Sequence, residues 1–277
     1  PEHSVKVYEY LNAAGVPSQA YFHQGGHGGP PPLELMNRWF TRYLYEVENG
    51  VEDDPKAWIV RENADRSDPT PYPDYPNPAS APVTLRPLAG GVQVGGLALG
   101  ESPGQGTETL VDNFSFSGAT LAQAEWTDHR LLYATPELRR DVHISGTPTV
   151  TIRLASSAPS ANLSVWVVSL PWPEGQTPLG GLITRGWADP QNHSSLSESE
   201  ALEPGQFYDL TFELQPDDQI IPEGQKIGLM IFSSDREFTL WPPPGTELTV
   251  DLDFTSLEIP VVGGEPVFRE AVGGEDR

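Results

Sequence analysis

The sequence predicts a mainly β protein, a jelly-roll β-sandwich preceded by a short α/β portion. The first observation is a period of two in residues 149–157, where apolar residues such as Val150, Ile152 and Leu154 alternate with polar ones. The same alternation recurs in segments 207–214, 226–232 and 248–254. The second observation is that turn residues such as Pro204-Gly205 separate these segments. Many short alternating strands between turns are typical of an antiparallel sandwich.

The first predicted element is a short helix that runs from Ser4 to Gly15. Val7, Leu11 and Ala14 recur at helical spacing and predict its buried face. Ser4 is a suitable N-cap, and Gly15 is a suitable C-terminal stop. Residues 18–22 end in two aromatic side chains and predict a buried strand.

A glycine-rich loop around His27 follows that strand, and a second helix is predicted after Pro32. We expect this helix to end at Asn49-Gly50 and to pack by one face only. The order of helix, strand and loop is that of an α/β unit, whose sites lie beyond the carboxyl ends of strands. The predicted apolar face of the second helix consists of Leu33, Met36, Phe40, Tyr43, Leu44 and Val47.

We place the domain change near residue 53, which gives an α/β portion over 1–52 and a β domain over 53–277. Residues 56–60 predict a short strand, and a proline-rich connector spans 63–82. Tyr72 and Tyr75 could pack, so we expect the connector to follow a surface, with a flexible linker as the alternative.

Composition excludes several classes of protein. The chain has 277 residues and 37% hydrophobic content, enough for a substantial core. Its formal charge of −23 argues against nucleic acid and anionic membrane as partners. With no cysteine there is no disulfide or thiolate site, and no apolar run reaches the roughly 18 residues that span a bilayer. We expect a soluble protein, cytoplasmic or secreted, and leave a homo-oligomer open.

The start of the chain also carries a prediction. Pro1 leads almost directly into a helical pattern, with no initiator Met and no targeting segment. We therefore expect a fragment of a longer protein.

His27 is the candidate catalytic residue, because glycines on both sides of it leave room for an incoming group. A histidine on a loop between rigid elements can reach a nucleophile as a general base. The alternative is a solvent-exposed loop histidine without chemistry. His23 and His27 are four residues apart, but the intervening glycines disfavour a helix, so we predict no metal site.

Residues 100–104 match the letters of the G-x-S-x-G nucleophile motif around Ser102. That motif needs a helix after the serine and a backbone N–H on the next residue. Pro103 has no N–H, and the following residues are a poor helix start. We therefore interpret Ser102 as a turn residue.

The β portion holds other aromatic and imidazole side chains. Its histidines are expected on strand faces or loops, and its tryptophans in the interior, with sugar stacking as the alternative. The residues concerned are His129, His143, His193, Trp166, Trp172, Trp187 and Trp241.

Long segments carry a resemblance to a known family. They are PEHSVKVYEYLNAAGVPSQAYFHQGGHG, RWFTRYLYEVENGV, RLLYATPELRRDVHISGTPTVTIRLASSAPSANLSVWVV, GLITRGWADPQNHSSL and IPEGQKIGLMIFSSD. Together they resemble the carboxyl-terminal half of the Xaa-Pro dipeptidyl-peptidases over nearly the whole chain. Cocaine-esterase-like and α-amino-acid ester hydrolases are also similar, but they usually carry Gly-Pro-Trp-x-His where this chain has Gln24-Gly25-Gly26-His27.

The resemblance implies an α/β-hydrolase with a jelly-roll (galactose-binding-like) domain, and residues 1–52 as the last part of the catalytic domain. His27 would be the triad histidine, while the serine and the acidic residue would lie upstream of Pro1. The implied reaction is release of an N-terminal Xaa-Pro dipeptide from a proline-containing peptide, without a cofactor. The alternatives are an ester hydrolase and, in another class, a β domain that binds or only packs.

Overall fold

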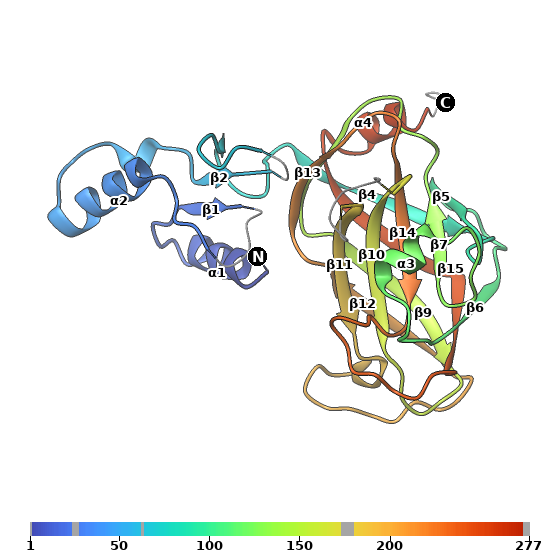
Figure 1. Cartoon of the computed structure of the whole chain (residues 1–277). Coiled ribbons are helices and arrows are strands. Elements are labelled where there is room, and N and C mark those ends of the chain that lie inside the picture. The colour runs from blue at the N-terminus through green and yellow to red at the C-terminus, as the bar shows by residue number, and fades with distance from the viewer. Residues whose placement is uncertain (1, 24–27, 62–63, 173–179, 274–277) are drawn as a thin grey trace.

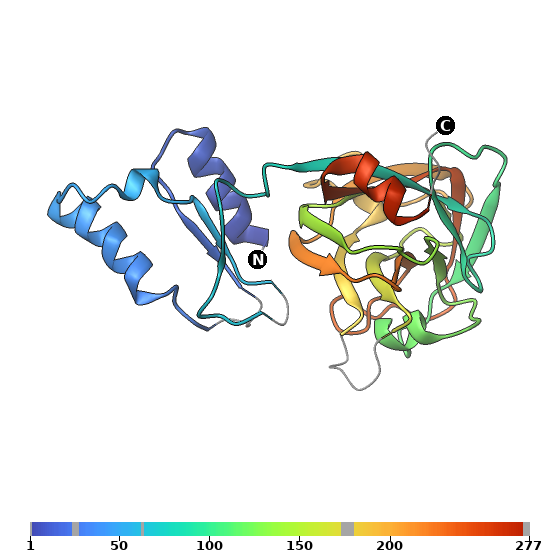
Figure 2. The same ribbon diagram turned by 90° about the horizontal axis from the view of Figure 1, so that it is seen from above.

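The computed structural model describes residues 2–23, 28–61, 64–172 and 180–273. A smaller N-terminal part, with two α-helices, one short 3₁₀-helix and three strands among its described residues, lies beside a large β-rich part (Figure 1). Seen from above, α4 lies across one end of the β-rich part, where it contacts β4, β8 and β15 (Figure 2). The helices are α1 (Glu2–Ala13), α2 (Leu33–Tyr45), η1 (Val51–Asp53), α3 (Gly118–Gln123), η2 (Pro190–Asn192) and α4 (Gly264–Ala271).

Helix α1 confirms the first predicted helix but presents another face. It begins at Glu2, so the predicted N-cap Ser4 lies inside the helix. Its buried side chains are Val5 and Tyr8, whereas Val7 of the predicted face is 58% exposed. The predicted face was therefore wrong.

The reason is the size of one aromatic side chain. The ring of Tyr8 packs edge-on against Phe22 with centroids 6.3 Å apart, and its hydroxyl donates to Asp74 at 2.6 Å. An aromatic ring buries more apolar area than a small aliphatic side chain, so it fixes the rotation of the helix. The predicted stop is confirmed, because Gly15 has a φ of +69° and follows the last turn.

Helix α2 ends earlier than predicted. Glu46 adopts a left-handed conformation with φ 57°, and its N–H donates to Thr41 C=O. None of the thirteen residues of α2 is buried, and Leu33 and Leu44 of the predicted apolar face are 76% and 69% exposed. The described part of the chain therefore leaves this face largely uncovered.

The N-terminal part has a small sheet of its own. It consists of β1 (Ala20–Phe22), β2 (Ala57–Ile59) and β3 (Thr70–Tyr72), in the order β1-β2-β3. Strands β1 and β2 are parallel, and β2 and β3 are antiparallel. The strands predicted near 18–22 and 56–60 are thus confirmed, and β3 comes from the proline-rich connector.

The connector is packed at both of its tyrosines. Tyr72 and Tyr75 are 4% and 6% exposed and join the core of the N-terminal part. Asp74 accepts hydrogen bonds from Tyr8 and from Asn12 on α1. These residues confirm a connector that follows a surface, against the flexible-linker alternative.

Twelve strands form one large mixed sheet, in which the described pairings are antiparallel except for β5 with β7. The chain is therefore mainly β, as predicted. The strands are β4 (Ser80–Leu88), β5 (Gly95–Leu99), β6 (Thr107–Val111), β7 (Leu131–Ala134), β8 (Val142–Gly146), β9 (Thr149–Ser156), β10 (Leu163–Leu170), β11 (Leu182–Ala188), β12 (Phe207–Glu213), β13 (Asp217–Ile221), β14 (Lys226–Phe232) and β15 (Glu247–Val262).

The sheet wraps around its core until two edges meet. Its path runs β11-β10-β14-β7-β5-β4-β15-β8-β13, and β12 joins through β9. Gln215, which follows β12, donates its N–H to the C=O of Arg185 on β11 at 2.8 Å. The sheet is therefore nearly closed, which leaves few unpaired strand edges.

Strand β14 departs from the predicted alternation, because all of its residues from Ile227 to Phe232 are buried. Ile227, Leu229 and Ile231 face the main core, while Met230 and Phe232 pack with Trp166 in a second cluster. Helix α3 contributes Leu121 and Ala122 to that cluster and covers the outer face of the sheet.

The described helices include none with the length and apolar character needed to cross a bilayer. Within the same residues, no group of three or more histidine, aspartate and glutamate side chains is arranged to hold a metal ion.

Tyr8 gives a testable pH dependence. Burial, helped by the hydrogen bond to Asp74, raises the pKa of Tyr8 to about 12. Because the folded pKa exceeds the unfolded value near 10, the stabilisation is complete below pH 10 and is lost as pH rises to 12. We expect wild-type stability relative to Tyr8→Phe to fall by about 2–3 kcal/mol across this window, measured by urea unfolding. Tyr10→Phe, at an exposed site on the same helix, should follow wild type. Parallel profiles for wild type and Tyr8→Phe would contradict the assignment.

Candidate active site

The histidine segment begins at the carboxyl end of β1. Phe22, the last residue of this strand, accepts a hydrogen bond from the N–H of Val60 at 2.8 Å, which extends the parallel pairing with β2. His23 follows Phe22, so the segment leaves the sheet at its carboxyl edge, as the α/β pattern predicts. The predicted catalytic residue, His27, belongs to 24–27 and lies outside the described residues.

His23, the first imidazole of this segment, is held at the side of the sheet. Its ring lies 5.6 Å from the ring of Tyr21, and its Nε2 is 3.4 Å from Nη2 of Arg66. Its Nδ1 is buried and has no partner among the described residues. Among the described residues, His23 therefore contacts a phenol and a guanidinium.

Arg66 contacts the other end of the same segment, at Gly28. Its Nη2 donates to the C=O of Gly28 at 2.9 Å, and its own C=O accepts from the Tyr21 hydroxyl at 3.0 Å. Gly29 has a φ of +119°, and a Cβ there would lie 1.6 Å from Nη2 of Arg66. Sequence reasoning missed Arg66, because a lone arginine in a proline-rich stretch carries no signal for this role.

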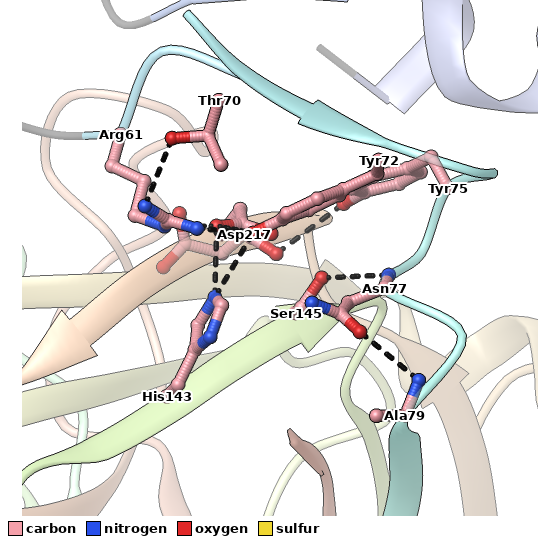
Figure 3. Close-up of polar contacts among 10 residues, drawn as sticks. Arg61, Thr70, Tyr72, Tyr75, Asn77, Ala79, His143, Ser145 and Asp217 are labelled. Carbon is pink, nitrogen blue, oxygen red and sulfur yellow. Dashed lines mark hydrogen bonds and ion pairs between the residues drawn. The ribbon is translucent and has the colours of Figure 1, made fainter. Parts of the chain in front are cut away.

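A second polar cluster joins the N-terminal part to the large sheet (Figure 3). Asp218, on β13, is 5% exposed. Its Oδ1 accepts from Nε of Arg61 at 2.8 Å and from the hydroxyl of Tyr72 at 3.1 Å, and it lies 3.0 Å from Nε2 of His143. Arg61 also donates to the hydroxyls of Thr70 and Tyr72.

The surroundings of Tyr72 keep its phenol protonated in this cluster. Burial raises the pKa of the Tyr72 phenol, and the neighbouring Asp218 carboxylate raises it further. Tyr72 therefore remains a neutral hydrogen-bond donor at neutral pH. His143 lies on β8, which confirms a strand-face position, but its partner on β13 was not predicted.

The remaining sequence candidates do not join either cluster. Ser102 lies between β5 and β6 in a segment without an assigned turn, and β6 follows it in place of the helix that the nucleophile motif requires. His129 lies near the C=O of Val111, and His193 packs on the ring of Tyr208. These histidines occupy structural positions.

The tryptophans divide into buried and exposed ones. Trp166 is fully buried, and its Nε1 donates to Asp235 at 3.0 Å, so interior packing is confirmed there. Trp187 donates to the same carboxylate at 3.1 Å. Trp241 is 58% exposed and stacks on Phe114, with ring centroids 5.3 Å apart.

Gly29 and Gly28 form a matched pair for a test of the loop geometry. We expect Gly29→Ala to cost about 1–3 kcal/mol, since the backbone strains and the new methyl group displaces the Arg66 guanidinium. Gly28→Ala meets no atom within 4 Å and should be nearly neutral. Urea unfolding of both variants checks this expectation, and equal stabilities would contradict the described packing of Arg66.

Comparison with known proteins places these features in a family. A putative Xaa-Pro dipeptidyl-peptidase of Rhodopirellula baltica is 59% identical over 266 residues, which cover 95% of this chain and 42% of that protein. The chain thus spans less than half the length of this relative.

Two solved structures share the fold. An aminopeptidase from a marine sediment thaumarchaeon superposes with a TM-score of 0.71 at 16% identity, covering 94% of this chain and 52% of that one. An α-amino acid ester hydrolase superposes with a TM-score of 0.60 at 17% identity, covering 82% and 44%.

The family model for the X-Pro dipeptidyl-peptidase C-terminal non-catalytic domain matches residues 49–266. This match takes in β2, β3 and the whole large sheet. It agrees with the resemblance carried by the sequence segments. The chain therefore belongs to the family of X-Pro dipeptidyl-peptidase C-terminal domains.

Proposed function

We propose that this chain is the C-terminal portion of a serine hydrolase that releases N-terminal Xaa-Pro dipeptides, with His27 as the general base of its Ser-His-Asp triad. The observation that carries the proposal is the 59% identity to the Rhodopirellula baltica protein. Because that similarity covers 95% of the chain, the segment 21–29 falls inside it.

The local fold supports this role for the histidine segment. In α/β enzymes, reactive side chains lie on loops beyond the carboxyl ends of parallel strands. The segment leaves β1 at such an end, beside the parallel strand β2. A histidine here would take a proton from the serine hydroxyl and later return it to the leaving amine.

The exposed apolar face of α2 supports the proposal that another portion of the catalytic domain packs on this helix. Together with residues of α1, β1 and β2 and with the segment that leads into β1, this helix lines a hollow of about 410 Å³. An amphipathic helix with no buried residue gains little from its own chain, so its apolar face needs a partner. We propose the upstream portion of the same catalytic domain as that partner, with residues 1–52 as the last segment of an α/β-hydrolase domain.

The nearly closed sheet would be the jelly roll of this enzyme and would make up most of a second domain over residues 53–277. The family model describes the matched region as non-catalytic, in agreement with a packing role beside the catalytic domain. An ester hydrolase remains the second candidate, because an enzyme of that kind shares the fold. Comparing Xaa-Pro amides with amino-acid esters as substrates of the intact protein separates the two.

His27→Ala in the intact protein tests the assignment of the base. Turnover of a Gly-Pro chromogenic substrate should fall by at least about 10³-fold, because the serine loses its proton acceptor. His193→Ala, far along the chain, is the matched control and should keep wild-type turnover. Near-normal activity of His27→Ala, or loss of activity in His23→Ala instead, would overturn the assignment.

The 277-residue chain alone should not hydrolyse Gly-Pro substrates, because a base without its nucleophile has nothing to activate. The measurement is release of the chromophore by the purified chain beside the intact protein at equal concentration. Hydrolysis by the purified chain would show that the serine lies within these residues.

A further inference from the structure

Strand β13 of the large sheet is linked, through residues in between, to both the backbone and the ring of Phe22. The histidine segment continues from this residue. The two consecutive aspartates of β13 reach the N-terminal part by separate routes. Asp218 acts through a side chain that follows β2, and Asp217 acts through a side chain of the connector. Figure 3 shows Arg61, Tyr72 and Tyr75 gathered at this junction.

The first route runs along the backbone of β2. The N–H of Val60 donates to the C=O of Phe22 at 2.8 Å, and Arg61 is the next residue. The Nε of Arg61 then donates to Oδ1 of Asp218 at 2.8 Å, with side chains that are 22% and 5% exposed. A displacement of Asp218 is therefore passed to the strand that holds Phe22 in place.

The second route runs through the ring of Phe22. This ring packs against Tyr75 in a tilted, edge-on geometry, with centroids 5.1 Å apart. Tyr75 is 6% exposed, and its hydroxyl donates to the C=O of Asp217 at 3.3 Å. The backbone and the side chain of Phe22 are thus held by neighbouring residues of one strand.

Two ion pairs that join described residues of the N-terminal part to the sheet differ in burial. The Lys6–Glu213 pair, at 3.3 Å, has side chains that are 52% and 55% exposed, and such pairs contribute about 0–1 kcal/mol. Removing one partner of a buried pair costs about 3–5 kcal/mol. Arg61–Asp218 is therefore the stronger constraint, and it lies at the edge of the sheet from which the histidine segment leaves.

We infer that Asp218 and Arg61 are positioning residues for the histidine segment, so that the non-catalytic domain sets the placement of the catalytic base. The inference rests on the proposed function, in which His27 is that base. Displacing a catalytic group by about 1 Å can cost 10²-fold in rate, even when the change lies away from the chemistry.

The test uses Asp218→Asn in the intact enzyme, with Glu213→Gln as the matched control. The asparagine keeps the shape of the side chain and removes the charge that holds Arg61. A serine-reactive phosphonate counts the folded active sites, so that a loss of folded protein is separated from a loss of rate. We expect kcat per active site on Gly-Pro-p-nitroanilide to fall about 10–100-fold with KM within about twofold, and Glu213→Gln to match wild type.

A second variant provides the test if Asp218→Asn does not fold. Tyr72→Phe removes only the hydroxyl that donates to Asp218, and it should lower kcat per active site in the same direction. Wild-type kcat per active site in Asp218→Asn, or in Tyr72→Phe where Asp218→Asn does not fold, overturns the positioning role alone. An intact wild-type protein without Gly-Pro activity overturns the proposed function itself, and the inference with it.

Discussion

Strand β15 is the constraint on which the large sheet depends. It pairs with β6 and β9 over its first half and with β4, β8 and β9 over its second half. Its register with β9 shifts between Asp251 and Ser256. The buried positions change at the same place, from Leu248, Val250 and Leu252 to Leu257, Ile259 and Val261. The irregularity moves the apolar set from even to odd positions, and both halves therefore face the core.

The same irregularity explains why the sequence pattern predicted only the first half of β15. Alternation identified 248–254 as a strand, but it fails where Phe254 is 58% exposed and Thr255 is fully buried. The pattern therefore predicts half of a strand that extends from Glu247 to Val262. Strand β9 was predictable because only one of its faces packs on the main core. Strand β10 was missed because all but its last residue are buried, and its apolar residues 165–168 are consecutive instead of alternating with polar ones.

The candidate site was predictable only where the signal is local. The glycines around His27 and the preceding aromatic residues point to a loop at the end of a strand, and β1 confirms the strand. Arg61 and Asp218 stand 157 positions apart, and no spacing within either segment indicates that they meet. Their contact depends on how β13 comes to lie beside the N-terminal part, which is a property of the whole fold.

The two parts of the chain differ in how much of their apolar surface they bury within themselves. The large sheet encloses a main core and a second cluster under α3, and it buries the guanidinium of Arg130 against the carbonyls of Gly91, Leu121 and Ala124. Within its described residues, the N-terminal part has a small core beneath α1, and no residue of α2 is buried. The N-terminal part therefore exposes apolar surface that is suited to packing against another polypeptide segment.

The position of β1 has a consequence for how this domain can be exchanged between proteins. The family match begins at residue 49, whereas β1 ends at Phe22, so the match contains β2 without its parallel partner. A recombination point at residue 49 would cut a hydrogen-bonded strand pair and expose Ala57 and Ile59, which are fully or almost fully buried. Gene fusions that transfer this domain intact should therefore carry β1 and the histidine segment after it together with the β domain.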